Sequence, residues 1–259
     1  MTRPALKFFR SSISIPVIIA ALLCAPSPTL AGDDAFHFDI TPYLWLPSVN
    51  NQLDVKGVPI EFGTNIDATD IFDKLDFAFL VAGQARIKRF GVYYDVQGVK
   101  LSDDGNLPRN IGNGYHYSTT FVAGTLGLQY RLFDERKFSL DLLAGARAVY
   151  AEVSVGIDET ARTPELKGDQ NKWWVDPIVG IKGSYHFTDK WAVHGYADYG
   201  GFDTSSRYVY QLIGTVSYSF TDHIALQVGY RFFADDYENG AFKLNTKLYG
   251  PVAGLTFSF

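Results

Sequence analysis

The chain has 259 residues, a formal net charge of −5 and a single cysteine, and 15% of its residues are aromatic. One cysteine excludes a disulfide framework, and an acidic chain without a basic cluster argues against nucleic acid as a partner. The length suits one domain, because no Pro/Ser tract, charge block or low-complexity run divides it.

The first 31 residues have the features of a secretory signal peptide. Three basic residues precede an apolar run from Ile13 to Leu23, and a Thr-Leu-Ala sequence ending at Ala31 offers small residues at the cleavage site. The run is too short for a membrane-spanning helix. Cys24 raises the alternative of a lipoprotein, but the residue before it is not the small one that a lipobox requires. We therefore expect a signal peptide at 1–31 and one exported domain at 32–259.

Apolar and polar residues alternate along most of the exported domain, which is the pattern of strands with one apolar face. No apolar run of 18 residues follows the signal, so no membrane-spanning helix is expected. The alternation predicts ten strands, near 36–44, 77–86, 92–97, 122–131, 138–147, 173–187, 191–199, 208–220, 224–232 and from about 243 to the end.

The expected connections alternate strictly between short and long. Short ones fall near 88–91, 132–137, 187–190 and 220–223, and longer ones near 47–75, 103–116, 155–171, 201–206 and 235–242. This alternation is typical of outer-membrane barrels with short periplasmic turns and long external loops. The sequence therefore predicts an all-β fold, a ten-stranded antiparallel up-and-down transmembrane barrel.

The segment 47–75 leaves an alternative strand count open. Residues 53–55 and 58–62 predict a small hairpin around Gly57, and 67–75 reads as a short helix. If the hairpin were longer and crossed the bilayer, the barrel would have twelve strands.

The face opposite the apolar one carries the charges. A charge at the bilayer midplane costs about 2–4 kcal/mol, so these residues must point into the lumen. A soluble lipocalin-like barrel would instead turn its apolar face inward. The expected charged network of the lumen comprises Asp39, Arg86, Asp95, Arg131, Asp141, Arg147, Asp176, Lys182, Asp198 and Arg231.

Two ion pairs are predicted within this network, Asp141 with Arg131 and Arg86 with Asp95, each diagonal across neighbouring strands. Such pairs can close a narrow barrel by bonding across its interior. The same residues could instead line a permeation path, and their mixed sign argues against strong ion selectivity.

The C-terminal strand ends in an aromatic residue, with Phe257 and Phe259 as the expected assembly signal. The chain resembles a group of mostly uncharacterised proteobacterial outer-membrane β-barrel proteins, porin-like and opacity-type. The resemblance implies that the barrel-assembly machinery reads the terminal strand, and it implies no reaction or substrate. It rests on Phe259 and on residues 42–47 (Pro-Tyr-Leu-Trp-Leu-Pro), 174–180, 198–202 and 229–231.

Catalytic readings find little support. An omptin-like protease needs acidic and histidine residues at the outer rim, and His194 should lie near the turn end instead. A lipid A deacylase needs a His-Ser pair with an acid, and no neighbouring His-Ser pair occurs. The acidic residues Asp67, Asp70, Asp73 and Asp76 lack the spacing of a calcium loop. We therefore expect no enzyme, no metal and no cofactor.

Two functions from different classes remain. The first is a narrow passive channel for ions or small solutes in the outer membrane. The alternative is a closed structural or surface-interaction barrel, whose loops contact lipopolysaccharide or other partners, and a hydrolase is a distant third.

Overall fold

The computed structural model describes residues 36–55, 58–60, 74–105, 114–157, 166–239 and 242–259. Within these residues no helix is long and apolar enough to cross a membrane. The strands are β1 (Phe36–Trp45), β2 (Ser48–Val55), β3 (Val58–Ile60), β4 (Leu75–Ile87), β5 (Phe90–Gly105), β6 (Tyr115–Asp134), β7 (Phe138–Ile157), β8 (Leu166–His186), β9 (Trp191–Gly200), β10 (Ser206–Ser219), β11 (Ile224–Asn239) and β12 (Phe242–Ser258).

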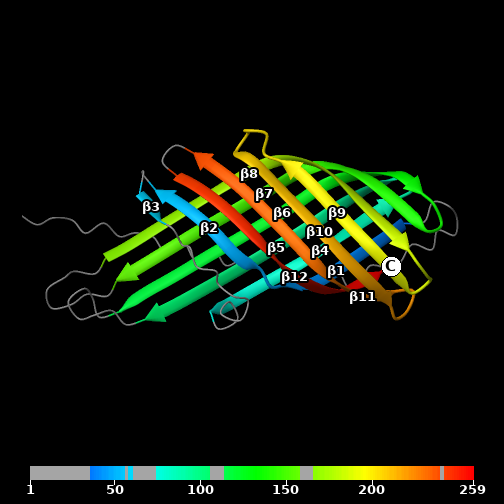
Figure 1. The fold of residues 1–259 in the computed structure, drawn as a ribbon, viewed down its shortest axis with the longest axis horizontal. Helices are drawn as coiled ribbons and strands as arrows, with labels where there is room; N and C mark the ends of the chain where they lie inside the picture. The colour runs from blue at the N-terminus through cyan, green and yellow to red at the C-terminus, as the bar shows by residue number, and fades with distance from the viewer. Residues whose placement is uncertain (1–35, 56–57, 61–73, 106–113, 158–165, 240–241) are drawn as a thin grey trace, which may run out of the picture.

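The strands form one closed antiparallel barrel (Figure 1). From β4 to β12 each strand pairs with the next along the chain, and β1 pairs with both β4 and β12, which closes the ring. The strand β2 continues along the same partner, since β12 pairs with β1 at residues 252–258 and with β2 at 242–249. Because β1 and β2 occupy one position in the ring, the barrel has ten strands, as the sequence predicts.

The segment after β1 holds the expected hairpin. Val55 of β2 pairs with Val58 of β3, and Leu53 pairs with Ile60. The hairpin lies beside β12 and adds no strand to the ring, so the twelve-stranded alternative is wrong. The expected helix and the first three of the spaced acidic residues fall almost entirely in 61–73, outside the described residues.

Two of the expected long loops are shorter in the structure. In the expected loop 155–171, β7 runs on to Ile157 and β8 already starts at Leu166. Residues 235–242 were expected to connect two strands, but β11 runs on to Asn239 and β12 starts at Phe242. Asp235 pairs with Thr246 in this extension. In this extension the outward side chains of the strands are polar. The change from apolar to polar outward residues therefore marks the end of the apolar belt and not the end of the strands.

Two of the short turns use the same chemistry. The hydroxyl of Thr188 accepts hydrogen bonds from the backbone N–H groups of Lys190 and Trp191, at 3.2 and 3.1 Å. Thr221 does the same for the N–H groups two and three residues on. A threonine that satisfies the backbone of its own turn favours a tight reversal at that point.

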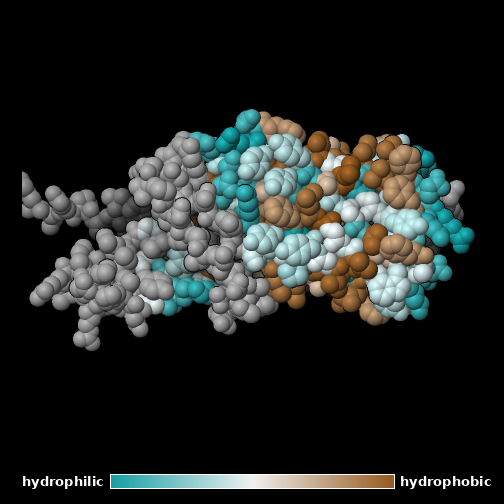
Figure 2. Space-filling view, viewed as in Figure 1, coloured by the Kyte–Doolittle hydropathy of each residue, from teal (hydrophilic) through white to brown (hydrophobic). Residues whose placement is uncertain are grey.

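The outer face of the barrel is an apolar belt between two rows of aromatic side chains (Figure 2). Along β8 the belt extends from Trp173 at one end to Tyr185 at the other. With about 3.3 Å per residue and a tilt of roughly 45°, this stretch is about 28 Å high, close to the apolar band of outer-membrane barrels. The strands β6, β7 and β8 have 20 or 21 residues and extend beyond the belt at the end opposite the short turns.

Candidate functional site

The lumen is filled by the polar face of the strands. Ten strands leave an interior only slightly wider than that of eight-stranded barrels, which inward side chains can fill. Of the ten charged residues expected there, Asp39, Arg86 and Lys182 are half-buried. The other seven are buried: Asp95, Arg131, Asp141, Arg147, Asp176, Asp198 and Arg231.

Arg147 on β7 is fully buried and reaches past β8 to Asp198 on β9. Its two terminal nitrogens donate to the two carboxylate oxygens at 3.0 and 2.5 Å, and its Nε donates to Thr125 at 3.0 Å. Tyr196 donates a further hydrogen bond to the same carboxylate at 2.6 Å. The guanidinium also lies 5.4 Å from the ring of Phe233 on β11. This group therefore connects three separate parts of the barrel wall.

Arg231 on β11 forms a second bridge across the lumen. It pairs with Asp95 on β5 at 2.9 Å and donates to Tyr43 and Gln211 at 2.6 Å each. Tyr43 donates in turn to Asp95 at 2.7 Å. The guanidinium also lies 4.7 Å from the ring centroid of Trp45. Arg231 therefore has a carboxylate as counter-charge and an aromatic ring against the face of its guanidinium.

The lumen beyond these bridges, toward the end with the long connections, holds a third cluster. Asp176 accepts hydrogen bonds from the N–H and the hydroxyl of Ser206 at 2.8 and 2.7 Å. Trp174 donates to Asp235 at 3.2 Å and stacks on Tyr237 with ring centroids 4.2 Å apart. The carboxylates of Asp176 and Asp235 thus accept hydrogen bonds from neutral donors.

Toward the short turns the lumen opens into a polar cavity of about 540 Å³, which we call the vestibule; Asp39, Gln84, Arg86, Arg131, Asp141, Lys182 and His194 are among its lining residues. Gln84 lies at the centre of its hydrogen bonds: it accepts from Lys182 at 2.5 Å and from Gln129 at 3.0 Å, and it donates to Asp39 at 2.6 Å. The vestibule is therefore lined by both charged and neutral polar groups.

The two ion pairs predicted from the sequence have different outcomes. Arg131 and Asp141 do pair, from directly opposite positions on β6 and β7. The pairing of Arg86 with Asp95 is wrong, because Asp95 turns across the lumen to Arg231. Arg86 instead lies 3.9 Å from Asp134. In the ladder of β4 and β5, Arg86 is opposite Gly91 and Asp95 is opposite Ala82, so the two residues lie four positions apart, and strand alternation does not give this register.

The histidines form two pairs that sequence spacing did not predict. His194 and Ser217, on neighbouring strands at the vestibule, lie 2.8 Å apart. Within the described part of the chain no carboxylate forms an ion pair with His194. His116 and Asp104 lie 2.7 Å apart on the outer surface and are both exposed. Among the described residues no group of three or more potential metal ligands occurs.

Sequence reasoning missed the neutral residues that complete the lumen. Thr125, Gln211 and Tyr196 lie at inward positions of their strands and bond directly to the charged groups. The alternation could have identified their positions. Their partners depend on which strands face each other across the closed ring.

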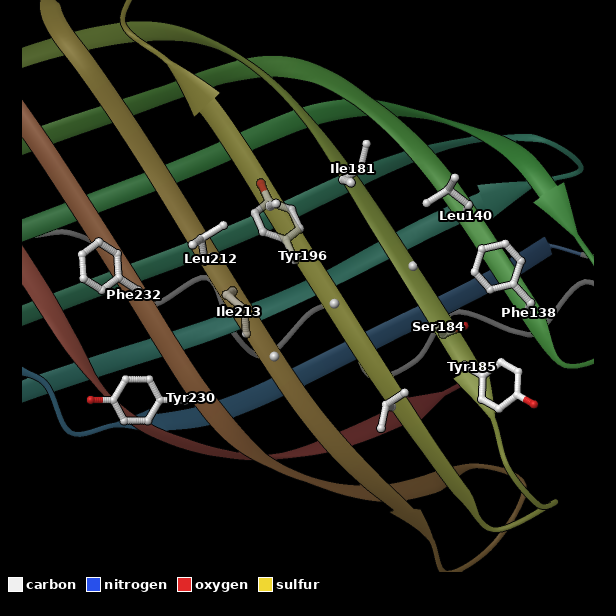
Figure 3. Close-up of a pocket in the computed structure, with 15 residues that line it drawn as sticks. Phe138, Leu140, Ile181, Ser184, Tyr185, Tyr196, Leu212, Ile213, Tyr230 and Phe232 are labelled. Carbon is white, nitrogen blue, oxygen red and sulfur yellow. The ribbon is translucent and has the colours of Figure 1, made fainter.

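A second concavity lies on the outer face, over β7 to β11 (Figure 3). It has a volume of about 550 Å³ and contains no charged lining residue among those described. Gly183, Gly195 and Gly214 are paired side by side on three neighbouring strands and form its floor. The wall includes Leu140, Ile181, Leu212 and Phe232. The groove therefore opens toward the apolar belt, and its lining is mostly apolar and carries no charged group.

No protein-family model and no curated protein sequence matches the chain. Among solved structures, the outer membrane protease OmpT from Escherichia coli is similar with a TM-score of 0.54 and 12% identity over 90% of this chain and 100% of that one. The attachment invasion locus protein Ail of Yersinia pestis has a TM-score of 0.36 and 9% identity, over 87% and 99%. The toluene transporter TodX of Pseudomonas putida has a TM-score of 0.33 and 12% identity, over 88% and 90%.

The closed ring and the similarity to OmpT define the fold class. The fold is that of Gram-negative outer-membrane β-barrels, with a ring of ten strands. At such low identities the similarity concerns the fold alone, because one barrel architecture carries many unrelated functions.

Proposed function

We propose that this protein is a closed outer-membrane barrel, which acts as a scaffold for interactions at the cell surface rather than as an open pore. The observation that carries this is the set of contacts across the lumen. Arg231 reaches Asp95 at 2.9 Å, and Tyr93 stacks on Tyr196 with centroids 5.0 Å apart. A path for hydrated solutes would have to break these contacts.

The strand ends beyond the apolar belt are the proposed contact region. The strands β6 to β8 extend farthest, and their outward residues there are polar, as with Glu152 beside Tyr150. In this proposal the region faces outward from the cell, where lipopolysaccharide is the neighbouring surface. Residues 1–31 serve as the export signal, and the terminal Phe259 is read by the assembly machinery.

A narrow channel is the second candidate, because the vestibule is a polar cavity that could form part of a path. The resemblance to porin-like proteins favours it, and the buried bridges disfavour it. We propose no catalytic role, since the Ser217–His194 pair has no carboxylate partner among the described residues.

The proposal is tested by solute flux. Refolded protein in liposomes should give no more swelling in small sugars than empty liposomes, whereas an open porin in a parallel sample should give rapid swelling. Swelling at the rate of the open porin would support the channel and contradict the scaffold.

A further inference from the structure

Two cations of the vestibule have few partners. Lys182 donates to Gln84, and its ammonium lies 5.8 Å from the ring centroid of Tyr93. Among the described residues no carboxylate lies within 4.0 Å of this ammonium. An ammonium group carries three donors, and water or a ligand must satisfy those that the protein leaves unused.

The carboxylate placed to neutralise Lys182 is already occupied. Asp141 is directly opposite Lys182 in the register of β7 and β8. Its oxygens instead accept hydrogen bonds from Arg131, which also donates to Asp134 at 2.7 Å. The other acidic neighbour, Asp39, bonds to Gln84. The nearby acids therefore have partners, while Lys182 keeps unused donors.

Arg86 also has few bonding partners. It lies two residues along β4 from Gln84, on the same face of the strand, and its closest carboxylate is Asp134 at 3.9 Å. Its Nε is buried and has no hydrogen-bond partner. Among the described residues, the five donors of this guanidinium thus have one distant carboxylate contact.

We propose that the vestibule binds the oxyanion of a small molecule, a carboxylate or a phosphate, between Lys182 and Arg86. A guanidinium and an ammonium together match such a group, and the 540 Å³ volume falls in the range of small-molecule pockets. Acidic and basic residues line the vestibule in equal numbers, the acids being Asp39, Asp95, Asp134, Glu135 and Asp141 and the bases Arg86, Arg131, Arg136, Lys182 and Arg231. The vestibule therefore has no net positive charge, and the anion would be bound by the unused N–H donors of Lys182 and Arg86.

This inference goes beyond the scaffold function and does not depend on it, since binding in detergent can be measured whether or not the barrel conducts. The probes are sodium phosphate and sodium acetate, each titrated calorimetrically into refolded protein at constant ionic strength set with sodium chloride. Wild-type protein should bind at least one of them saturably. Phosphate alone would identify a phosphate-type ligand and acetate alone a carboxylate.

Arg86→Gln and Lys182→Gln should each weaken this binding about ten- to a hundredfold, the value of a charged hydrogen bond. Both variants should fold, because neither leaves a carboxylate without its close partner. Lys190→Gln, in a short turn at the same end of the barrel but not among the residues that line the vestibule, should bind like wild type. Equal affinity in all four proteins, or no saturable binding by wild type, would overturn the proposal.

A second measurement needs no variant. The bound anion should slow the chemical acetylation of Lys182 in the wild-type protein and leave that of Lys190 unchanged, as mapped by mass spectrometry. Equal rates at Lys182 with and without a saturating anion would count against the site.

Discussion

At the scale of single residues, the lumen shows that residues opposite each other in the strand register are not always the ones that pair. Arg147 is opposite Asp176 in the pairing of β7 and β8. It nevertheless binds Asp198, and Asp176 is held by Ser206. Arg147 and Asp198 are thus each other's counter-charge, so the removal of one leaves the other buried without it.

Arg147→Ala should destabilise the barrel by about 3–5 kcal/mol, because it leaves the carboxylate of Asp198 buried without its cation. The measurement is the urea dependence of unfolding in lipid vesicles. Arg207→Ala is the matched control, since Arg207 pairs with Asp236 at 3.5 Å and is largely exposed. It should cost no more than about 1 kcal/mol. Equal losses in the two variants would show that water in the lumen screens the buried pair.

At the scale of elements, neighbouring strands approach most closely at particular glycines. A Cβ added to Gly229 of β11 would lie 2.0 Å from the carbonyl oxygen of Gly214. A Cβ added to Gly195, on the outer face, would meet no atom within 4 Å.

Gly229→Ala should therefore lower the free energy of unfolding by about 1–3 kcal/mol, the usual cost of overpacking. Gly195→Ala should change it by less than about 0.5 kcal/mol, since nothing in the barrel must move. Both are measured by the same urea titration. A larger loss in Gly195→Ala than in Gly229→Ala would contradict the close approach of β10 and β11.

Phe259, directly after β12, extends the pairing with β1 that closes the ring. The backbone of Phe259 exchanges hydrogen bonds with that of Phe38 at 2.9 and 3.1 Å, while its ring is exposed at the edge of the apolar belt. An aromatic ring is favourable at this interface, and a charge is not.

Phe259→Asp should reduce the amount of heat-modifiable barrel in the outer membrane and leave export and signal cleavage intact. Phe220→Asp is the control, because Phe220 is an exposed aromatic at the same end of the barrel but not at the terminus. It should have a smaller effect if the terminal residue is read as a signal. Equal amounts of folded Phe259→Asp and wild-type protein would contradict an assembly role.

The strands and their faces could be predicted from the sequence, and the contacts of the lumen could not. Alternation of apolar and polar residues gave β8, β10 and β11 because a membrane barrel imposes that period on every strand. It placed Asp235 in a loop, because the outward residues become polar where the membrane ends. The partner of Asp95 depends on barrel closure, which brings β5 opposite β11 although 119 to 149 residues separate the two strands along the chain.

At the scale of the whole molecule, the barrel has an apolar outer face and a lumen in which side chains bond to one another. The vestibule is a cavity at the end with the short turns. The bridges involve strands on opposite sides of the ring, as with Arg231 on β11 and Asp95 on β5. Such contacts both hold the wall together and occupy the space that a channel would need. Closure of the lumen is therefore the property on which the proposed function depends.

Single-channel recording in planar lipid bilayers tests this closure most directly. Wild-type protein, inserted from detergent and shown to be folded by its heat-dependent gel mobility, should give no steady conductance steps above the bare bilayer. An open porin recorded in the same chamber serves as the positive control. Steady, uniform steps from the wild-type barrel, comparable with those of the open porin, would contradict a closed lumen and favour the channel.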